Sequence, residues 1–195
     1  DRRRRQSEPR HERTHRPEPW QVVSAAMPGV RMVPFGEEHL AAFAAMLDDD
    51  DVRRFTRIPD PLPEGFANAF FERYRDGREE GRRELFAGIG EDATFAGIAL
   101  APKIDREGQE AELGYVVTAA ARGRGIATQL LGEITRWAFA EDIVRAYLII
   151  DVVNAPSLAV ARRCGYFHEG TLRSTYVKDG APRADVTVWS RLSRD

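Results

Sequence analysis

The chain has 195 residues, of which 43% are hydrophobic and 31% charged, with a formal net charge of −2. This composition is typical of one globular domain with a substantial core, and it argues against a second full domain. The nearly balanced charge argues against nucleic acid as an obligatory partner. No run of 18 apolar residues is present, so we expect no membrane span, and the single cysteine, Cys164, allows no intrachain disulfide.

The first 28 residues are predicted to be a disordered tail rich in arginine and proline. Residues 1–20 hold seven arginines and three prolines and almost nothing apolar before Trp20, so they bury too little surface to order themselves. The arginines are not followed by the apolar segment of a signal peptide, so we expect a cytoplasmic protein. The folded domain is predicted to cover residues 29–195.

The N-terminal half of the domain predicts a strand at 30–33, helices at 37–47 and 64–80, and strands at 84–90 and 94–104. Four consecutive carboxylates, Asp48 to Asp51, are expected to end the first helix, because negative charge opposes the dipole at a helix C-terminus. They read either as a solvated loop or as an electrostatic attraction for a cationic amine.

The C-terminal half predicts a strand at 110–117 and an amphipathic helix at 126–140. A strand at 147–153 is apolar at both parities, which predicts burial on both faces. Pro156 suits the first turn of a further helix, which ends near Gly165. A hairpin of strands 166–177 and 184–192 follows, with Asp179-Gly180 at its turn.

The turn between the strand at 110–117 and the helix at 126–140 is the strongest local signal of function. It reads Arg122-Gly123-Arg124-Gly125-Ile126-Ala127. Glycines let a backbone approach an anion closely, and the first N–H groups of a helix have no partner within the helix, so the turn predicts a phosphate site. Neither the Walker pattern nor the dinucleotide fingerprint fits, and such a turn also occurs without any ligand.

Several motifs in register resemble the GNAT superfamily of acyl-CoA N-acyltransferases, and more closely its RimJ/RimL-like branch of ribosomal-protein N-terminal acetyltransferases. Besides residues 122–127, the matching motifs are Glu112-Leu113-Gly114-Tyr115, Trp137-Ala138-Phe139, Asn154-Ala155-Pro156-Ser157, Cys164-Gly165-Tyr166 and Glu169-Gly170-Thr171-Leu172-Arg173. The resemblance implies a single α/β (α+β) domain with a mixed, mostly antiparallel, splayed sheet of six to seven strands, flanked by about four helices.

The same resemblance implies acetyl-CoA as co-substrate, with no metal. The pyrophosphate is expected on the backbone of the glycine-rich turn, the pantetheine arm between two splayed strands, and the thioester carbonyl on the N–H of Val116 or Val117. The expected cofactor-binding residues are Val116, Val117, Arg122, Gly123, Arg124, Gly125, Ile126, Ala127, Thr128, Asn154 and Ser157.

Two side chains are predicted to be catalytic. Glu112 is the expected general base, with a salt-bridged surface glutamate as the alternative. Ser157 is the expected proton donor to the leaving thiolate, with a helix-capping role as the alternative. The helix after Asn154 lacks the tyrosine that many superfamily members use as proton donor, and Tyr166 is the fallback.

The predicted function is transfer of an acetyl group from acetyl-CoA to a primary amine by direct attack in a ternary complex. A protein or peptide α-amino group is the first choice of acceptor. A small amine, such as a polyamine, an aminoglycoside or an amino-acid derivative, is the first alternative, and a non-catalytic acyl-CoA-binding module is the second. Relatives in the resembled branch are often dimers, which makes a homodimer the expected assembly.

Overall fold

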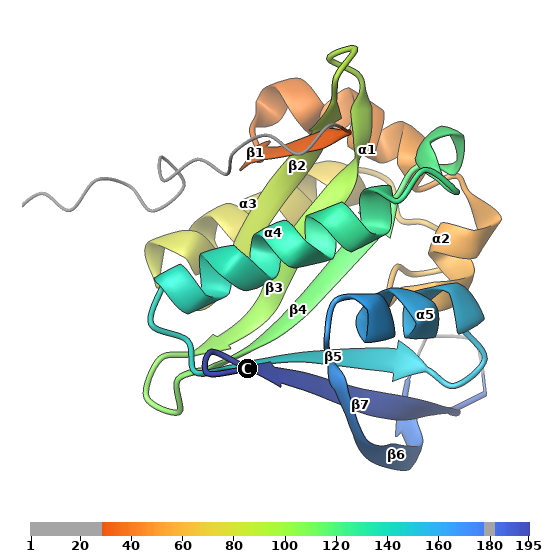
Figure 1. The fold of residues 1–195 in the computed structure, drawn as a ribbon. Helices are drawn as coiled ribbons and strands as arrows, with labels where there is room; N and C mark the ends of the chain where they lie inside the picture. The colour runs from red at the N-terminus through yellow and green to blue at the C-terminus, as the bar shows by residue number, and fades with distance from the viewer. Residues whose placement is uncertain (1–28, 178–181) are drawn as a thin grey trace, which may run out of the picture.

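A computed structural model describes residues 29–177 and 182–195 of the chain. These residues form one seven-stranded sheet in the order β1-β2-β3-β4-β5-β7-β6 (Figure 1). The strands are β1 (Val30–Pro34), β2 (Glu84–Gly90), β3 (Phe95–Asp105), β4 (Glu110–Val117), β5 (Arg145–Asp151), β6 (Phe167–Tyr176) and β7 (Ala184–Leu192). The α-helices are α1 (Leu40–Met46), α2 (Asp50–Phe55), α3 (Phe66–Glu79), α4 (Ile126–Ala140) and α5 (Ala155–Arg163). All strand pairs are antiparallel except β4–β5, which confirms the predicted mixed sheet.

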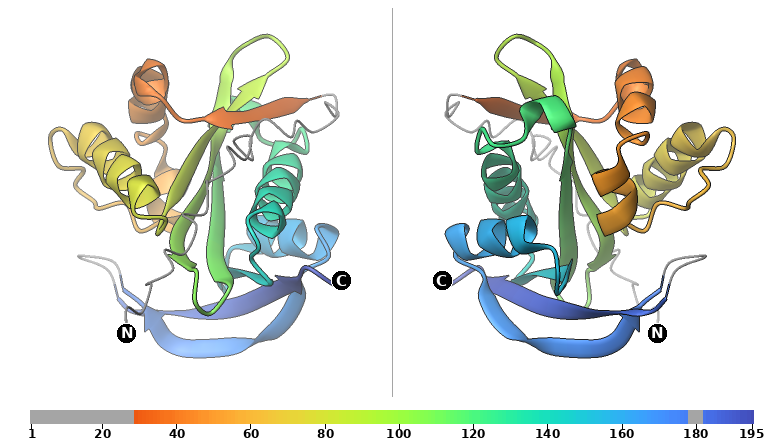
Figure 2. Two further views of the ribbon diagram at one scale, coloured as in Figure 1. Left: turned by 90° about the vertical axis from the view of Figure 1, so that its left-hand side faces the viewer. Right: turned by 90° about the vertical axis from the view of Figure 1, so that its right-hand side faces the viewer.

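Helices cover both faces of the sheet and enclose two hydrophobic clusters. Helices α1, α2 and α3 lie on one face, and α4 and α5 lie on the other (Figure 2). The predicted apolar stripe of α4 is confirmed, since Ile126, Leu130 and Ile134 are buried against the sheet. On the opposite face Phe43 of α1 packs with Phe70 of α3. Each strand residue therefore belongs either to the α4 side or to the α3 side of the molecule.

The two parallel strands separate soon after they begin. Strands β4 and β5 pair only at Glu110 with Arg145, Ala111 with Ala146 and Glu112 with Tyr147. Beyond these pairs β4 continues to Val117 and β5 to Asp151, and the two diverge (Figure 1). The backbone polar groups along the inner edges of both strands are thereby left for a ligand.

The acidic run follows the end of α1, as predicted, and it also begins a second helix that was not predicted. After the 3₁₀ helix η2 (Glu37–His39) and α1, Asp49 caps α2, and its Oδ1 accepts a hydrogen bond from the N–H of Val52 at 3.0 Å. Asp50 and Asp51 occupy the first turn of α2. Carboxylates at a helix N-terminus favour the dipole that they would oppose at a C-terminus, so the run stabilises α2.

Strand β5 is buried on one face only, which corrects the prediction of burial on both. Ala146, Leu148 and Ile150 are buried, whereas the alternate residues are partly exposed. The strand also starts two residues before the predicted position 147 and ends at Asp151, before the exposed Val153. Helices α4 and α5 pack against the buried face of β5, whereas α3 on the other side of the sheet packs against β2. The predicted turn at Asp179-Gly180 and the predicted tail lie outside the described residues.

Candidate active site

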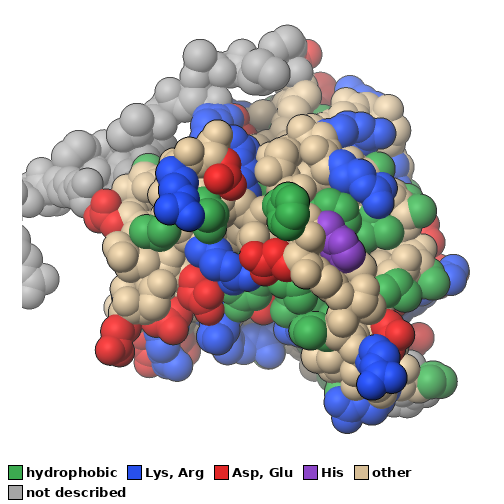
Figure 3. Space-filling view, turned by 60° about the horizontal axis from the view of Figure 1, so that its bottom comes forward, with side chains coloured by type: hydrophobic (Ala, Val, Ile, Leu, Met, Phe, Trp, Pro, Cys, Tyr) green, Lys and Arg blue, Asp and Glu red, His purple; other side chains and the backbone are tan. Residues whose placement is uncertain are grey.

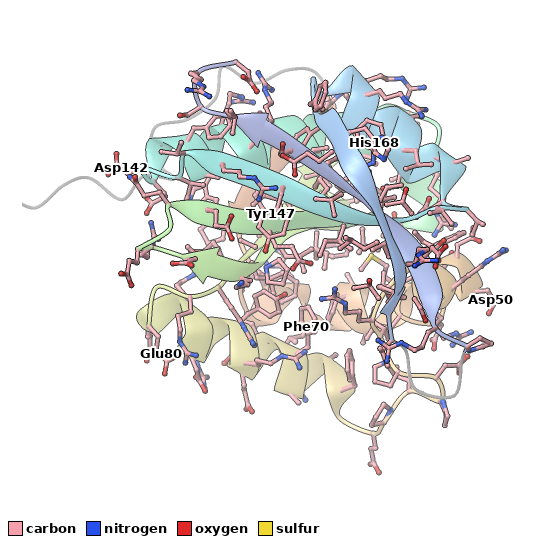
Figure 4. The ribbon with its side chains drawn as sticks, turned by 90° about the horizontal axis from the view of Figure 1, so that it is seen from below. Asp50, Phe70, Glu80, Asp142, Tyr147 and His168 are labelled. Carbon is pink, nitrogen blue, oxygen red and sulfur yellow. The ribbon has the colours of Figure 1, made fainter. Side chains whose placement is uncertain are left out.

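A cleft of about 630 Å³ opens where β4 and β5 diverge. Its walls come from both strands and from α2, α3 and α5, together with Tyr176 of β6. Figure 4 shows Phe70 of α3 and Tyr147 of β5 on facing sides of the space between α3 and the strands. On the neighbouring surface, charged side chains of both signs are interspersed with hydrophobic ones (Figure 3).

The glycine-rich turn adopts the conformation predicted for a phosphate site. Gly123 and Gly125 have φ angles of +74° and +78°, a left-handed conformation that favours glycine. Gly125 is the N-cap of α4, and the N–H of Gln129 makes the first helical hydrogen bond, to the Gly125 carbonyl. The N–H groups of residues 126–128 precede this bond, so they have no partner within the helix. They form a set of donors at the positive end of the helix dipole.

Arg122 takes part in a contact that the sequence did not predict. Its guanidinium donates hydrogen bonds to Asp49 Oδ1 at 2.6 Å and to Asp51 Oδ2 at 3.0 Å. These bonds lower the pKa of Asp49 below its ordinary value. Arg122 therefore ties the turn to the start of α2, whereas Arg124 is exposed and makes no ion pair with any described residue.

Backbone direction along β4 determines which N–H groups face the cleft. The N–H of Thr118 donates to the Ala96 carbonyl of β3, and the Val116 carbonyl lies against Gly97, where an added Cβ would stand 2.1 Å away. Because this direction alternates along a strand, the N–H groups of Tyr115 and Val117 face the edge left open by β5. Of the two predicted residues, Val117 therefore has its N–H on the open edge, together with Tyr115, whereas Val116 lines the cleft with its side chain.

Asn154, Ser157 and Tyr115 meet on the α5 side of the cleft. Asn154 is the N-cap of α5, and its Oδ1 accepts a hydrogen bond from the Ser157 N–H at 3.2 Å. The Ser157 hydroxyl lies 2.8 Å from the Tyr115 hydroxyl. Burial, partly offset by the bond to Ser157, raises the pKa of Tyr115 to about 12. All three residues line the cleft.

Tyr115 brings a phenol hydroxyl into the cleft, which was predicted of neither α5 nor β4. The predicted fallback was Tyr166, whose hydroxyl bonds Thr135 at 2.7 Å within the core. Tyr166 is absent from the cleft lining, so the fallback role is not supported. The sequence did contain a signal for this position. Side chains alternate between the two faces of a strand, so Tyr115 had to lie on the opposite face of β4 from Glu112.

Glu112 lies on the α3 side of the cleft and is largely buried. Its side chain is 15% exposed, and Oε1 lies 3.6 Å from Nη1 of Arg57. Burial raises the pKa of Glu112, while the charges of Arg57 and Lys103 partly counteract that rise. The guanidinium of Arg57 also lies 5.6 Å from the ring centre of Tyr176. The sequence left two alternatives for Glu112, a desolvated general base and a salt-bridged glutamate. The structure shows a feature of each, because the carboxylate is desolvated and also forms an ion pair.

Within residues 29–177 and 182–195, no cluster of three or more His, Cys, Asp or Glu side chains is arranged to hold a metal. In the same part of the chain, no helix has the length and apolar character needed to cross a membrane.

The sequence matches the acetyltransferase (GNAT) domain family over residues 30–166. The chain therefore belongs to this family, a class of acyltransferases that use acetyl-CoA as donor. The predicted family, fold and co-substrate are thereby confirmed.

Three known proteins illustrate the similarity. YdaF of Bacillus subtilis (strain 168), provisionally named a ribosomal N-acetyltransferase, is 29% identical over 110 residues, which span 56% of this chain and 60% of that protein. A RimL structure, titled a ribosomal L7/L12 α-N-protein acetyltransferase with coenzyme A, has a TM-score of 0.77 at 21% identity and covers 84% of this chain and 94% of its own. The spermidine N-acetyltransferase of Vibrio cholerae, solved with coenzyme A and spermine, has a TM-score of 0.74 at 16% identity and covers 85% and 96%. At these identities the structures establish the fold, not the acceptor.

Proposed function

We propose that the protein transfers an acetyl group from acetyl-CoA to the α-amino group of a protein or peptide, by direct attack in a ternary complex. The observation that supports this most strongly is the cleft between β4 and β5, which joins the helix N-terminus at 126–128 to the buried carboxylate of Glu112. The names of YdaF and RimL favour a protein acceptor.

Backbone groups hold the donor in this proposal. The pyrophosphate accepts hydrogen bonds from the turn at residues 123–128, where the glycine conformations keep the N–H groups accessible. The pantetheine arm lies between β4 and β5, along the edge that carries the Val117 N–H, with Asn154 nearby. The N–H of Tyr115 or Val117 stabilises the negative charge that develops on the thioester oxygen.

Glu112 activates the acceptor. An amine must be neutral to attack, so the ionised Glu112 takes one proton from the ammonium group, directly or through a water molecule. Burial raises the pKa of Glu112 and so makes its carboxylate a stronger base. The charge of Arg57 counteracts this rise in pKa and favours the ionised carboxylate.

Ser157 completes the reaction on the opposite face of β4. The amine nitrogen forms a bond to the carbonyl carbon and gives up its second proton to solvent, the carbon–sulfur bond breaks, and the thiolate takes a proton from the Ser157 hydroxyl. Tyr115 orients that hydroxyl through the 2.8 Å hydrogen bond and lies in position to return a proton to it. Exchange with solvent then removes the proton from Glu112 and replaces the one lost by Tyr115. The amide product and the free thiol then leave.

The test is release of free thiol from acetyl-CoA in the presence of defined amines. The panel contains peptide libraries covering every N-terminal residue, the same libraries with the N-terminus blocked, and a set of polyamines. We expect thiol release with the free libraries and none with the blocked ones. Release with polyamines alone would replace the proposal by the small-amine alternative, and binding of acetyl-CoA without release by any amine would favour the binding-module alternative.

Three further predictions belong to this proposal. The cytoplasm remains the expected location, and a homodimer remains the expected assembly. The tail at 1–28 and the domain at 29–195 remain the predicted division of the chain.

A further inference from the structure

The α3 wall of the cleft combines aromatic rings with two arginines. Phe70 and Tyr74 stack with ring centres 4.6 Å apart. The Arg73 guanidinium lies 5.2 Å from the centre of the Phe70 ring, and that of Arg83 lies 5.9 Å from the centre of the Tyr74 ring. All four side chains line the cleft, on the same side of β4 as Glu112.

This wall carries excess positive charge. The charged residues that line the cleft are Arg57, Arg73, Arg83, Arg122, Asp51, Glu112 and Asp151. Four of these charges cancel within two ion pairs, which join Arg57 to Glu112 and Arg122 to Asp51. Asp151 lies at the far end of β5, where its Oδ1 accepts a hydrogen bond from the Val153 N–H. Arg73 and Arg83 have no carboxylate partner among the described residues.

A tyrosine whose ring is buried and whose hydroxyl reaches the open space of the cleft lies beside these arginines. Tyr74 is 5% exposed and lines the cleft, and its hydroxyl makes no hydrogen bond to any residue that the structure describes. Burial raises the pKa of Tyr74, while the charges of Arg73, Arg83 and Arg57 act in the opposite direction and that of Glu112 adds to the rise. The hydroxyl therefore keeps its proton and lies within electrostatic range of all four charged groups.

Two guanidinium groups beside a hydroxyl donor that lines the cleft form a binding site for an oxyanion. Carboxylate and phosphate oxygens accept charge-assisted hydrogen bonds from arginine, often two at once, and a tyrosine hydroxyl adds a further donor. A cationic acceptor has the opposite preference, because its additional ammonium groups meet Arg73 and Arg83 with no carboxylate between them.

We propose that the acceptor carries a carboxylate or phosphate group near its reacting amine, bound by Arg73, Arg83 and Tyr74. This inference rests on the proposed transfer at Glu112 and names the substrate class for that site. For a polypeptide acceptor, the anionic group is the side chain of an acidic residue close to the free N-terminus. A free amino-acid derivative offers the same chemistry, whereas a polyamine does not.

The test compares matched amines that differ only in charge. Peptide pairs carry Glu or Gln at one of positions 1 to 4, and the free pairs are glutamate with glutamine and phosphoethanolamine with ethanolamine. With the wild-type protein, we expect kcat/KM to be at least about tenfold higher for the acidic peptide at one or more positions. If only the free anionic amines are acetylated, the proposed oxyanion site stands, but the proposal of a polypeptide acceptor is overturned.

Three variants connect that preference to the proposed site. Arg73→Glu should remove or reverse it, because the substitution places negative charge on the same wall. Tyr74→Phe keeps the ring packing and should raise KM for the acidic peptide alone. Arg75→Glu is the control, since Arg75 lies on the same helix, 52% exposed and outside the cleft lining, and it should keep the wild-type preference.

The outcomes separate this inference from the proposed function. Equal turnover of acidic and neutral partners in every pair would overturn the anionic acceptor and leave acetyl transfer intact. An acidic preference that survives Arg73→Glu and Tyr74→Phe unchanged would overturn the assigned residues. Absence of thiol release with any amine would overturn the proposed function itself.

Discussion

The donor and acceptor halves of the cleft are built in different ways. On the donor side the key groups belong to the backbone, namely two left-handed glycines, the free N–H groups at 126–128 and the open edge of β4. On the acceptor side they are side chains from separate elements, with Glu112 on β4, Arg57 after α2 and Tyr74 on α3. A backbone site requires one particular local sequence, whereas a side-chain site can be assembled from distant residues that share no pattern.

The largest expected effect is a loss of turnover without a loss of acetyl-CoA binding, caused by a substitution in the acceptor half. Glu112→Gln keeps the shape of the side chain but cannot accept the proton of the amine, so kcat should fall by about 10² to 10⁴. Affinity for acetyl-CoA should remain at the wild-type level, because Glu112 lies on the acceptor face. Steady-state thiol release measures kcat, and inhibition by coenzyme A measures the affinity of the donor site.

The matched control for that change is Glu107→Gln, at an exposed position in the turn between β3 and β4. It should leave both quantities unchanged. Loss of acetyl-CoA affinity in Glu112→Gln would show that the two halves are not separable in the way described.

The second effect belongs to the donor half. Gly125→Asp places a negative charge at the N-cap of α4, and aspartate tolerates the left-handed conformation, so the turn should persist. Repulsion of the pyrophosphate should weaken acetyl-CoA binding by about tenfold or more. Gly125→Asn has the same shape without the charge and should retain most of the affinity, so equal losses in the two variants would point to backbone strain instead.

A control within the same helix uses Gly132, which has open space at its Cβ position. Gly132→Ala should stabilise α4 by about 1 kcal/mol, since alanine has the higher helix propensity. Thermal unfolding should show the stabilisation, and acetyl-CoA affinity should not change.

A smaller effect is expected at the pair of hydroxyls. Tyr115→Phe removes the partner of Ser157 without changing the ring packing, and kcat should fall by about three- to tenfold. The double variant with Ser157→Ala should lose little more than Ser157→Ala alone, since Tyr115 acts through Ser157. A double-mutant cycle on kcat measures this coupling, and additive losses would mean that Tyr115 acts independently.

The smallest effect is a shift in pH dependence. Glu112 works as a base only when ionised, so activity appears as the pH rises through its pKa, which burial raises. Arg57→Gln removes the charge that counteracts this rise. The acid limb of the kcat/KM profile should therefore move to higher pH, and a limb that stays in place or moves to lower pH would contradict the assignment of Glu112.

The contrast between the halves also explains what sequence alone could predict. The turn at 122–127 and the stripe of α4 were correctly predicted because a few adjacent residues determine them. The end of α1 before the Asp48 to Asp51 run was correctly predicted, but α2 was not, because four carboxylates fit a solvated loop as well as a helix N-terminus. The single-sided burial of β5 escaped prediction because it depends on which strands α3 covers in the folded molecule.

The acceptor wall lay beyond sequence analysis for a related reason. Arg57, Arg73 and Arg83 are separated along the chain and match no motif, and only the packing of α3 against the sheet brings them to one cleft. The ion pairs of Arg122 with Asp49 and Asp51 likewise join residues more than 70 positions apart.

The backbone anion site at the start of α4 is the claim on which this account rests. The most direct measurement is a calorimetric titration of acetyl-CoA, and separately of S-acetylpantetheine, into the wild-type protein. We predict binding of acetyl-CoA at one site per chain and an affinity for S-acetylpantetheine that is lower by at least about tenfold, because only acetyl-CoA carries the pyrophosphate. Equal affinities for the two compounds, or no binding of acetyl-CoA, would contradict it.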